Sequence, residues 1–447
     1  MTRNTTPQMV LRLGAHAEKE FFIKGMSLFD GVIVGANLFE ATPGATSSLL
    51  LKFAASGKKI YIDPITYAFG IEFKYLQTEK VNKKTKQTTT EVKKSFASLS
   101  AKYGGPFALS LSKQRSITAN DLNAQNIEIV CEKIGAYQEN RIKEEFESDE
   151  ELKSLIDKAP KPSAIFAPYF YCPDDGFQPI LEANLNIIKV MVNKFGRERV
   201  HAVLCFHKDH LTNDSFLKTS LAALKSSGVT GVWLWISDFH ETRAAEHELS
   251  ALKKWTEALS EVAEVNNLHG AYFSYCLNKF GMTHVSHGVG YGENKDVIPV
   301  LSGGAPSVRY MLPPLHRRYG VPDIERTFEG LGIKTPRDFF EKICGCMVCK
   351  GVIRKDITEF SQFGEFYLPT PESKRQIQTP ASAKRCRFHY LFARRAEMNF
   401  VTKNTLPSIT QSLEQGYNQF VDEDSISSSD KGHPMRWATV LKGGAGD

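Results

Sequence analysis

The sequence lacks any long uninterrupted apolar segment. No apolar run reaches the roughly 18 residues that a membrane-spanning helix needs, and the opening residues, MTRNTTPQMVLRLGAHAEKEFF, contain no apolar core of signal-peptide length. We therefore expect a soluble, cytoplasmic protein without membrane contact. A large excess of charge of one sign is also missing, since the formal net charge is +6. This charge permits a polyanionic partner without requiring one.

Cysteine is too sparse for a disulfide scaffold. The chain has 8 cysteines in 447 residues, whereas disulfide frameworks belong to short, cysteine-dense secreted domains. Four of these cysteines lie among apolar neighbours and are interpreted as buried thiols: Cys131, Cys172, Cys205 and Cys276. The other four, Cys344, Cys346, Cys349 and Cys386, lie in the C-terminal part.

Short apolar runs alternate with segments of helical periodicity. The runs cover residues 29–35, 59–63, 163–167, 200–206, 231–236 and 283–286. Near-continuous apolar runs are typical of parallel strands that are covered on both faces. Residues 216–227, closed by Gly228, and residues 245–265 are predicted to be crossover helices. Because no GxGxxG follows the first run, we predict an α/β fold of the (β/α)8 TIM-like barrel type rather than a dinucleotide-binding sheet.

The composition divides the chain into three parts. Residues 1–335 are predicted to form the barrel, residues 336–420 a zinc-binding subdomain packed on it, and residues 421–447 a loosely ordered tail. A lysine-rich polar segment, 74–96, interrupts the barrel pattern and is predicted to be an exposed hairpin. It is either a phosphate-contacting arm or a solvated loop.

Three thiols within six residues form the most specific motif. Cys344, Cys346 and Cys349 follow the pattern CxCxxC, and a turn with this spacing can direct all three sulfurs at one ion. Tetrahedral Zn²⁺ needs a fourth ligand, and both Cys386 and His389 lie at the start of a predicted helix downstream. A closed four-ligand site is structural, because no position is left open for water.

The knuckle and its helix resemble a known signature. A CxCxxC knuckle followed by a helix that begins His-x-Leu-Phe is the zinc signature of the tRNA-guanine transglycosylases, and residues 389–392 read His-Tyr-Leu-Phe. The resemblance implies a structural Zn²⁺ held by Cys344, Cys346, Cys349 and His389, with Cys386 as the alternative to the histidine. It extends over residues 28–70 and 160–400 and includes the turn His287-Gly288-Val289-Gly290, which resembles a Met-Gly-Val-Gly turn of the family.

That family exchanges a guanine base in nucleic acid, and its DNA-directed branch inserts 7-deazaguanines into DNA. The form of the first motif, Ile-Asp-Pro-Ile-Thr-Tyr at 62–67, resembles this branch more than the tRNA branch. The resemblance therefore implies a pentosyltransferase that replaces guanine with a 7-deazaguanine in DNA or tRNA. Its partners are then the nucleic acid and the incoming base.

Two aspartates are the predicted catalytic residues. Base exchange at C1′ needs one carboxylate that stabilises or traps the sugar carbon and a second group that protonates the leaving base. Asp63 matches the first catalytic aspartate of the family and ends the run 59–62, and Asp238 follows the run 231–237. Barrel enzymes place such groups at the carboxyl ends of strands. Glu293 is the reserve acid.

Further residues are predicted to bind substrate. An extruded base is held between aromatic faces and read by a few hydrogen-bonding groups, glycine turns allow close backbone approach, and arginine suits phosphate because its planar fork donates two parallel hydrogen bonds. His207 falls near a family glutamine that reads the guanine edge. The predicted substrate-binding residues are Tyr67, His207, Gly288, Gly290, Glu293, Arg309 and Arg317.

One departure from the family keeps other hypotheses open. The nucleophilic aspartate of the family lies a few residues before a Leu-Pro pair, but residues 308–313 (VRYMLP) contain no acid. The chain is then either an enzyme with a relocated acid or a catalytically inactive nucleic-acid-binding relative in a homo- or heterodimer. A third hypothesis is a metal-dependent barrel hydrolase that uses Asp63, His207, His210, Asp238 and His240.

Overall fold

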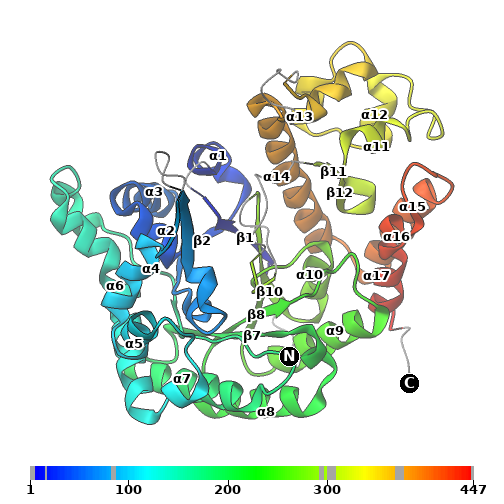
Figure 1. Cartoon of the computed structure of the whole chain (residues 1–447). Helices are drawn as coiled ribbons and strands as arrows, with labels where there is room; N and C mark the ends of the chain where they lie inside the picture. Colours follow the sequence, from blue (N-terminus) through cyan, green and yellow to red (C-terminus); the bar gives the residue numbers. More distant parts are fainter. Residues whose placement is uncertain are drawn as a thin grey trace.

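The computed structural model describes residues 6–15, 18–81, 87–290, 296–299, 309–367 and 377–443. Figure 1 shows a strand barrel surrounded by helices and, beside it, a C-terminal module that ends in the helices coloured orange to red. None of the described helices is long and apolar enough to cross a membrane.

Eight parallel strands form a nearly closed barrel, which confirms the predicted (β/α)8 TIM-like fold. In spatial order they are β3 (Lys59–Asp63), β2 (Gly31–Gly35), β1 (Gln8–Leu13), β10 (Met282–Gly288), β9 (Glu264–Asn267), β8 (Gly231–Ser237), β7 (Val200–His207) and β6 (Ile165–Phe166). The remaining gap, between β3 and β6, is bridged by Ser163, whose N–H donates to the Ile60 carbonyl at 2.7 Å. All strands therefore direct their carboxyl ends to one mouth.

Two of these strands were not predicted. Strand β1 lies in the N-terminal segment, and β9 lies inside the predicted helix 245–265, of which only Glu246–Ser260 is helical (α9). The predicted end of that helix is wrong because β9 is polar. Its Asn266 and Asn267 are buried and bond to the His284 N–H at 3.0 Å and the Ser274 hydroxyl at 2.9 Å. Hydrogen bonds rather than an apolar run stabilise this strand.

Helices cover the outside of the barrel. The predicted crossover helix 216–227 is α8 (Asp214–Ser227). It is capped at its N-terminus by Asn213, whose side chain accepts from Phe216 N, and at its C-terminus by Gly228 with φ of 69°. The other helices up to β10 are α1 (Lys19–Lys24), α2 (Ala36–Ala41), α3 (Pro43–Ala55), α4 (Lys94–Tyr103), α5 (Gly105–Lys113), α6 (Ala124–Ser148), α7 (Gln178–Phe195) and α10 (Tyr272–Cys276).

The lysine-rich segment contains an antiparallel hairpin. Strand β4 (Gln77–Val81) pairs with β5 (Thr88–Val92), and the side chains of Lys80 and Glu91 form an ion pair across it. Nearly all of its residues are exposed. The hairpin therefore lies on the surface of the insertion between β3 and β6.

The C-terminal module has a core of its own, which includes Tyr310, Leu312, Phe339, Phe360 and Phe363. This core begins at Tyr310, upstream of the boundary expected at 336. The module comprises the antiparallel pair β11 (Tyr310–Leu312) and β12 (Arg317–Tyr319) and the helices α11 (Val321–Glu325), α12 (Pro336–Lys342), α13 (Met347–Val352), α14 (Pro380–Lys403), α15 (Leu406–Phe420), α16 (Ser428–Lys431) and α17 (His433–Leu441).

The long helix α14 connects this module to the barrel, because its Leu391 and Met398 belong to the barrel core. The expectation of a loosely ordered tail over 421–447 is wrong for α17. Trp437 is fully buried, and its indole N–H donates to the Glu241 carbonyl at 2.9 Å. The polar residues before α17 dominated the composition of the segment, although one tryptophan is enough to anchor a short helix.

Candidate functional site

The predicted metal ligands come together. The sulfurs of Cys344, Cys346 and Cys349 and the Nδ1 atom of His389 all lie within 4.8 Å of one another. The sulfurs are 3.9, 3.5 and 3.4 Å from Nδ1. Ligands 2.0–2.3 Å from a tetrahedral zinc lie about 3.5–3.8 Å apart. Cys386 is directed away and contacts the Phe363 carbonyl at 3.2 Å, so His389 is the fourth ligand of this cluster.

The surroundings prepare these side chains for a metal. The Nε2–H group of His389 donates to the Met311 carbonyl at 2.6 Å, which leaves the Nδ1 lone pair facing the sulfurs. The Tyr310 ring stacks on His389 with centroids 4.0 Å apart, and its hydroxyl lies 3.1 Å from the Cys349 sulfur. Hydrogen bonds from Cys344 and Cys349 hold the pKa of the Cys346 thiol well below its usual range. Three sulfurs and one imidazole in this arrangement fit a structural Zn²⁺.

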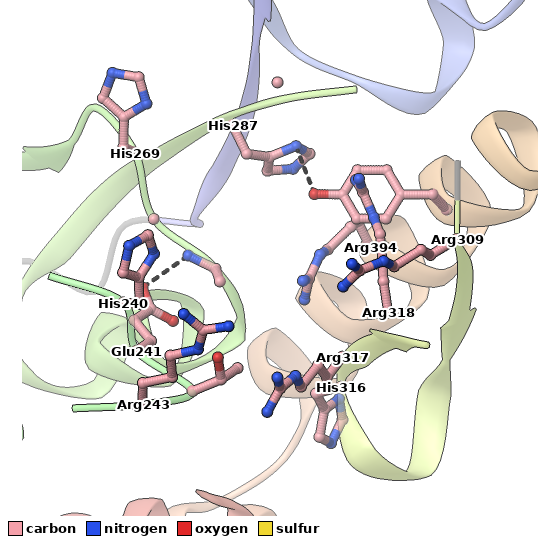
Figure 2. A pocket seen from close by; sticks show the side chains of 15 residues that line it. His240, Glu241, Arg243, His269, His287, Arg309, His316, Arg317, Arg318 and Arg394 are labelled. Atoms are coloured by element: carbon pink, nitrogen blue, oxygen red, sulfur yellow. Dashed lines mark hydrogen bonds between the residues drawn. The ribbon is translucent and has the colours of Figure 1, made fainter. Parts of the chain in front are cut away.

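A cavity of about 310 Å³, here called the arginine cavity, lies between the barrel mouth and the module. Figure 2 shows arginine side chains that approach it from both sides. Arg243 follows β8 in the barrel, whereas the other four arginines belong to the module or its entry. The residues that define the cavity are Arg243, Arg309, Arg317, Arg318, Arg394, His240, His269, His287, His316, Glu241, Gly288 and Tyr390.

Five arginines give the arginine cavity a cationic lining, although Arg317 pairs with Asp430 and Arg394 with Glu397 outside it. Among the described residues that line it, Glu241 is the one carboxylate, and its oxygens accept from Ala271 N at 2.7 Å, Phe273 N at 2.9 Å and the Ser274 hydroxyl at 2.6 Å. The Glu241 carboxylate is thus held by hydrogen bonds from the segment between β9 and β10. The cavity can therefore hold an anion with several negative oxygens.

The arginines are held in place by the module. Arg394 is only 5% exposed and donates to Glu397 at 2.6 Å, while its Nε atom is buried without a partner among the described residues. The Arg318 guanidinium lies 3.5 Å from the centre of the Tyr390 ring, and Tyr390 directly follows the candidate metal ligand His389. The cysteine–histidine cluster thus lies directly beside the part of α14 that supports Arg318 and carries Arg394.

A second cavity of about 310 Å³, here called the aromatic cavity, opens at the carboxyl ends of β1, β2, β3 and β8. Tyr67 and Trp235 meet edge to face, with centroids 4.5 Å apart and planes at 79°. Burial raises the pKa of Tyr67 above its ordinary value, so that this phenol stays neutral. The residues that define the cavity are Arg12, Asn37, Tyr67, Tyr75, Lys93, Phe96, Trp235, His269 and Asp296. Its dimensions and walls suit a planar ring.

The two cavities adjoin. His269 lines both of them, and its ring lies 4.7 Å from that of Trp235. His240 of the arginine cavity contacts Asp296 of the aromatic cavity, with 3.6 Å between Nε2 and Oδ1. A ligand with an anionic part and a planar part can therefore span both cavities with its linking atoms beside these side chains.

The two predicted catalytic aspartates, Asp63 and Asp238, are not in contact in the structure. Asp63 ends β3 and is fully buried. Its Oδ2 atom pairs with Arg12, and its Oδ1 atom accepts from the Tyr169 hydroxyl and from Ile65 N, both at 2.9 Å. Asp238 follows β8 in a left-handed conformation (φ 60°) and lies 3.3 Å from His207 Nε2. Neither lines the two cavities, and no hydrogen bond or ion pair connects them.

The other predicted residues are divided between the cavities and their margins. Tyr67 lines the aromatic cavity, whereas Gly288, Arg309 and Arg317 line the arginine cavity. His207 lies outside both, between Asp238 and Asp209.

Two predicted positions remain. A Cβ atom at Gly290 would lie 2.7 Å from Oε1 of Glu18, so this glycine permits close packing against a carboxylate. Glu293 lies outside the described residues.

The constellation required by a catalytic-metal hydrolase does not form. Within the described part of the chain, the cysteine–histidine cluster is the one group of three or more donor side chains close enough to hold an ion. His210 instead stacks on Phe216 at 4.7 Å and bonds to the Pro173 carbonyl at 2.6 Å.

Sequence reasoning missed several residues of the site, above all Arg12, Asp296 and His269. Arg12 carried a usable signal, since it is the lone charged residue in the otherwise apolar segment Met9–Leu13. A charge in a buried strand needs a partner and often marks a site. Asp296 and His269 carried no local signal.

Comparisons with known proteins add little. No protein-family model matches the chain, and a comparison with curated proteins found no match. Among solved structures, the chain is similar to a mutant protein in complex with xylotriose, with 10% sequence identity and a TM-score of 0.23 over 63% of this chain and 84% of that chain. A similarity this low supports no functional conclusion.

Proposed function

We propose that this chain exchanges a base in nucleic acid, replacing guanine with a 7-deazaguanine in DNA or tRNA. The observation that carries the proposal is the contact between an arginine-lined cavity and an aromatic cavity at the mouth of the barrel. An extruded nucleotide has the same two parts, a phosphate group and a planar base.

The arginine cavity binds the nucleic-acid backbone in this proposal. Arg309 and Arg317, which the sequence analysis assigned to substrate, take phosphate oxygens together with Arg318. Guanidinium groups donate paired hydrogen bonds to phosphate, and their charge adds a favourable term that does not depend on base sequence.

The aromatic cavity receives the base, and the reaction takes place where the cavities meet. Tyr67 and Trp235 enclose the ring, which places the sugar near the His240–Asp296 pair. A carboxylate oxygen bonds to C1′ while the C1′–N bond breaks, and the leaving base takes a proton from a neighbouring acid. The incoming base returns that proton and displaces the carboxylate.

Asp296 joins Asp63 and Asp238 as a candidate for the carboxylate. It lines the aromatic cavity, and it accepts from Asp238 N at 3.0 Å. Asp63 then acts by fixing Arg12, and Asp238 by positioning Asp296. The Zn²⁺ would be held by Cys344, Cys346, Cys349 and His389, where it supplies a structural cross-link and takes no part in bond breaking.

A second function is favoured by one observation. The oxygens of Asp63 are occupied by Arg12, Tyr169 and Ile65, so the acid that best matches the catalytic family position is not free to attack a sugar. This arrangement favours a catalytically inactive nucleic-acid-binding relative. The two functions share the same binding surface and differ in turnover.

The test is incorporation of a labelled base. The zinc-loaded chain is incubated with labelled guanine or a labelled 7-deazaguanine and either DNA or tRNA. We expect label in the polymer, and a decrease of about 10²- to 10⁴-fold in the rate for Asp296→Asn, as is typical when a group in the transition state is removed. Asp157→Asn, an exposed acid outside both cavities, is the control.

The outcomes separate the two functions. Binding of nucleic acid without incorporation by the unaltered chain would support the inactive relative. Full activity of Asp296→Asn together with loss of activity in Asp238→Asn would return the carboxylate role to the residue that the sequence analysis selected. Absence of both binding and incorporation would exclude both functions.

A further inference from the structure

Arg12 is a buried cation with a donor that the protein does not use. It is the fifth residue of β1, it is only 8% exposed, and it lines the aromatic cavity. Its Nη2 atom donates to Asp63, whereas its Nη1 atom is buried with no hydrogen-bond partner among the described residues. A buried donor without a partner is unfavourable, and an acceptor on a ligand removes that cost.

The guanidinium is also held in one orientation. Asp63 is fixed in turn by Tyr169 and Ile65, so that the carboxylate cannot rotate away from Arg12. The other side of the guanidinium faces the Trp235 ring, with 5.7 Å between Cζ and the ring centroid. The Nη1 donor therefore has a fixed position relative to the aromatic wall on which a planar ligand lies.

We propose that Arg12 determines the specificity of the aromatic cavity by donating from Nη1 to an acceptor on the edge of the bound base. Arginine has five N–H donors and no acceptor. A purine that presents a carbonyl oxygen and a ring nitrogen, as guanine does with O6 and N7, satisfies this group. Adenine presents an amino group at position 6 and leaves a donor facing a donor.

This inference rests on the proposed function only in taking the ligand to be a purine. It concerns which base enters, not whether exchange follows. Asp63 has a positioning role in it, since the carboxylate occupies one terminal nitrogen of Arg12 and leaves the other available for a ligand.

The first test is equilibrium dialysis of the zinc-loaded full chain against labelled guanine and labelled adenine, without nucleic acid. We expect guanine to bind at least tenfold more tightly. Arg12→Lys keeps a cation opposite Asp63 but removes the second nitrogen of the fork. It is expected to weaken guanine binding about 5- to 100-fold, as is typical for loss of an arginine–base contact, and to leave adenine binding within about twofold.

Arg115→Lys is the matched control. Arg115 also pairs with an aspartate, Asp121, at 2.5 Å, but it does not line the aromatic cavity. The same substitution at this position is expected to leave the preference for guanine unchanged. Retained preference in Arg12→Lys, or an equal loss in Arg115→Lys, overturns the assignment.

A second measurement needs no variant and so does not depend on the folding of Arg12→Lys. Hypoxanthine keeps O6 and N7, whereas 2-aminopurine lacks O6. We expect hypoxanthine to bind the unaltered chain like guanine and 2-aminopurine to bind as weakly as adenine. Equal affinities, or no binding of any purine, refute the role of Arg12. If the purines bind in the expected order of affinity but no base is incorporated into nucleic acid, the role of Arg12 stands and the proposed exchange activity is refuted.

Discussion

The two cavities are of the same size but are built in different ways. The aromatic cavity is formed within the barrel, and its buried cation, Arg12, has a carboxylate partner on a strand of the same sheet. The arginine cavity lies between two cores and collects cations from β12, from α14 and from a barrel loop. A single paired charge gives orientation and selectivity, whereas five arginines, of which Arg317 and Arg394 are paired with carboxylates, leave a net positive charge that attracts a polyanion.

In the proposed function, this difference separates recognition of the nucleic-acid backbone from recognition of the base. Residues from both the barrel and the module must be in place for the arginine cavity to exist, and the metal cluster lies in the module. Tyr390, which supports Arg318, is the neighbour of His389 in α14. The aromatic cavity depends on none of these residues. Binding of backbone and binding of base should therefore respond differently to the same perturbation.

Removal of the metal should have the largest effect and should act on one cavity. Structural zinc contributes about 10–16 kcal/mol of binding free energy that is also folding free energy. With a strong chelator, or in Cys349→Ser, we expect the module to unfold and nucleic-acid affinity to fall at least 100-fold. Guanine binding to the barrel should change by less than about threefold. Metal content, filter binding and equilibrium dialysis measure the three quantities.

Cys386→Ser is the control for this prediction, because its thiol contacts the Phe363 carbonyl and lies outside the cluster. It is expected to keep one zinc per chain and full affinity for nucleic acid. Equal loss of base and backbone binding after chelation would show that the two cavities are not separable.

The Arg12–Asp63 pair should carry the next largest effect, this time in the barrel. Asp63→Ala leaves the buried Arg12 without its counter-charge, and removing one partner of a buried pair costs about 3–5 kcal/mol. Urea unfolding at constant zinc should show this loss. Asp63→Asn keeps an acceptor and the shape, and its cost should be clearly smaller. Equal stability of Asp63→Ala and the unaltered chain would mean that Arg12 reaches solvent.

The same contrast explains what the sequence could predict. The metal ligands follow from spacing within six residues and one downstream imidazole, so the knuckle was recognisable locally. Most barrel strands were visible as apolar runs, whereas β9 was hidden because Asn266 and Asn267 replace apolar contacts with hydrogen bonds. The position of Asp63 at a strand end was predicted correctly.

The partner of Asp63 was not predictable, since Arg12 lies 51 positions earlier on a strand separated from β3 by β2. Likewise, His240 and Asp296 meet only because of the loops after β8 and β10. Contacts of this kind depend on the closed barrel and leave no trace in spacing or periodicity.

Acid should weaken both regions through buried neutral histidines. Burial lowers the pKa of His201 to about 4 and that of His284 to about 3 in the barrel, and lowers that of His433 to about 3 in the module. Below about pH 6.5 the unfolded chain binds protons that the folded chain does not, so stability falls as the pH falls. At pH 5 each histidine should cost about 2 kcal/mol.

Denaturant unfolding between pH 7.5 and pH 5 at saturating zinc measures this dependence. His201→Gln should reduce the loss of unfolding free energy over this range by the contribution of one histidine. A pH-independent unfolding free energy over this range would contradict the assignment of these imidazoles as neutral. If His433→Gln alone abolished the pH dependence of the unfolding free energy, the acid sensitivity would lie in the module.

The smallest effect should come from a single arginine of the arginine cavity. Arg318→Ala removes one cation that the proposed function assigns to a phosphate. Each neutralised phosphate contributes about 0.9 to the slope of log affinity against log salt concentration on duplex DNA, so this slope should decrease by about 1 and affinity should fall for all sequences alike. Arg337→Ala is the control, since Arg337 is exposed on α12 and pairs with Glu341. If Arg318→Ala instead changed the preference for guanine and left the salt dependence intact, the assignment of the two cavities would be reversed, because selectivity would then reside where the cations gather.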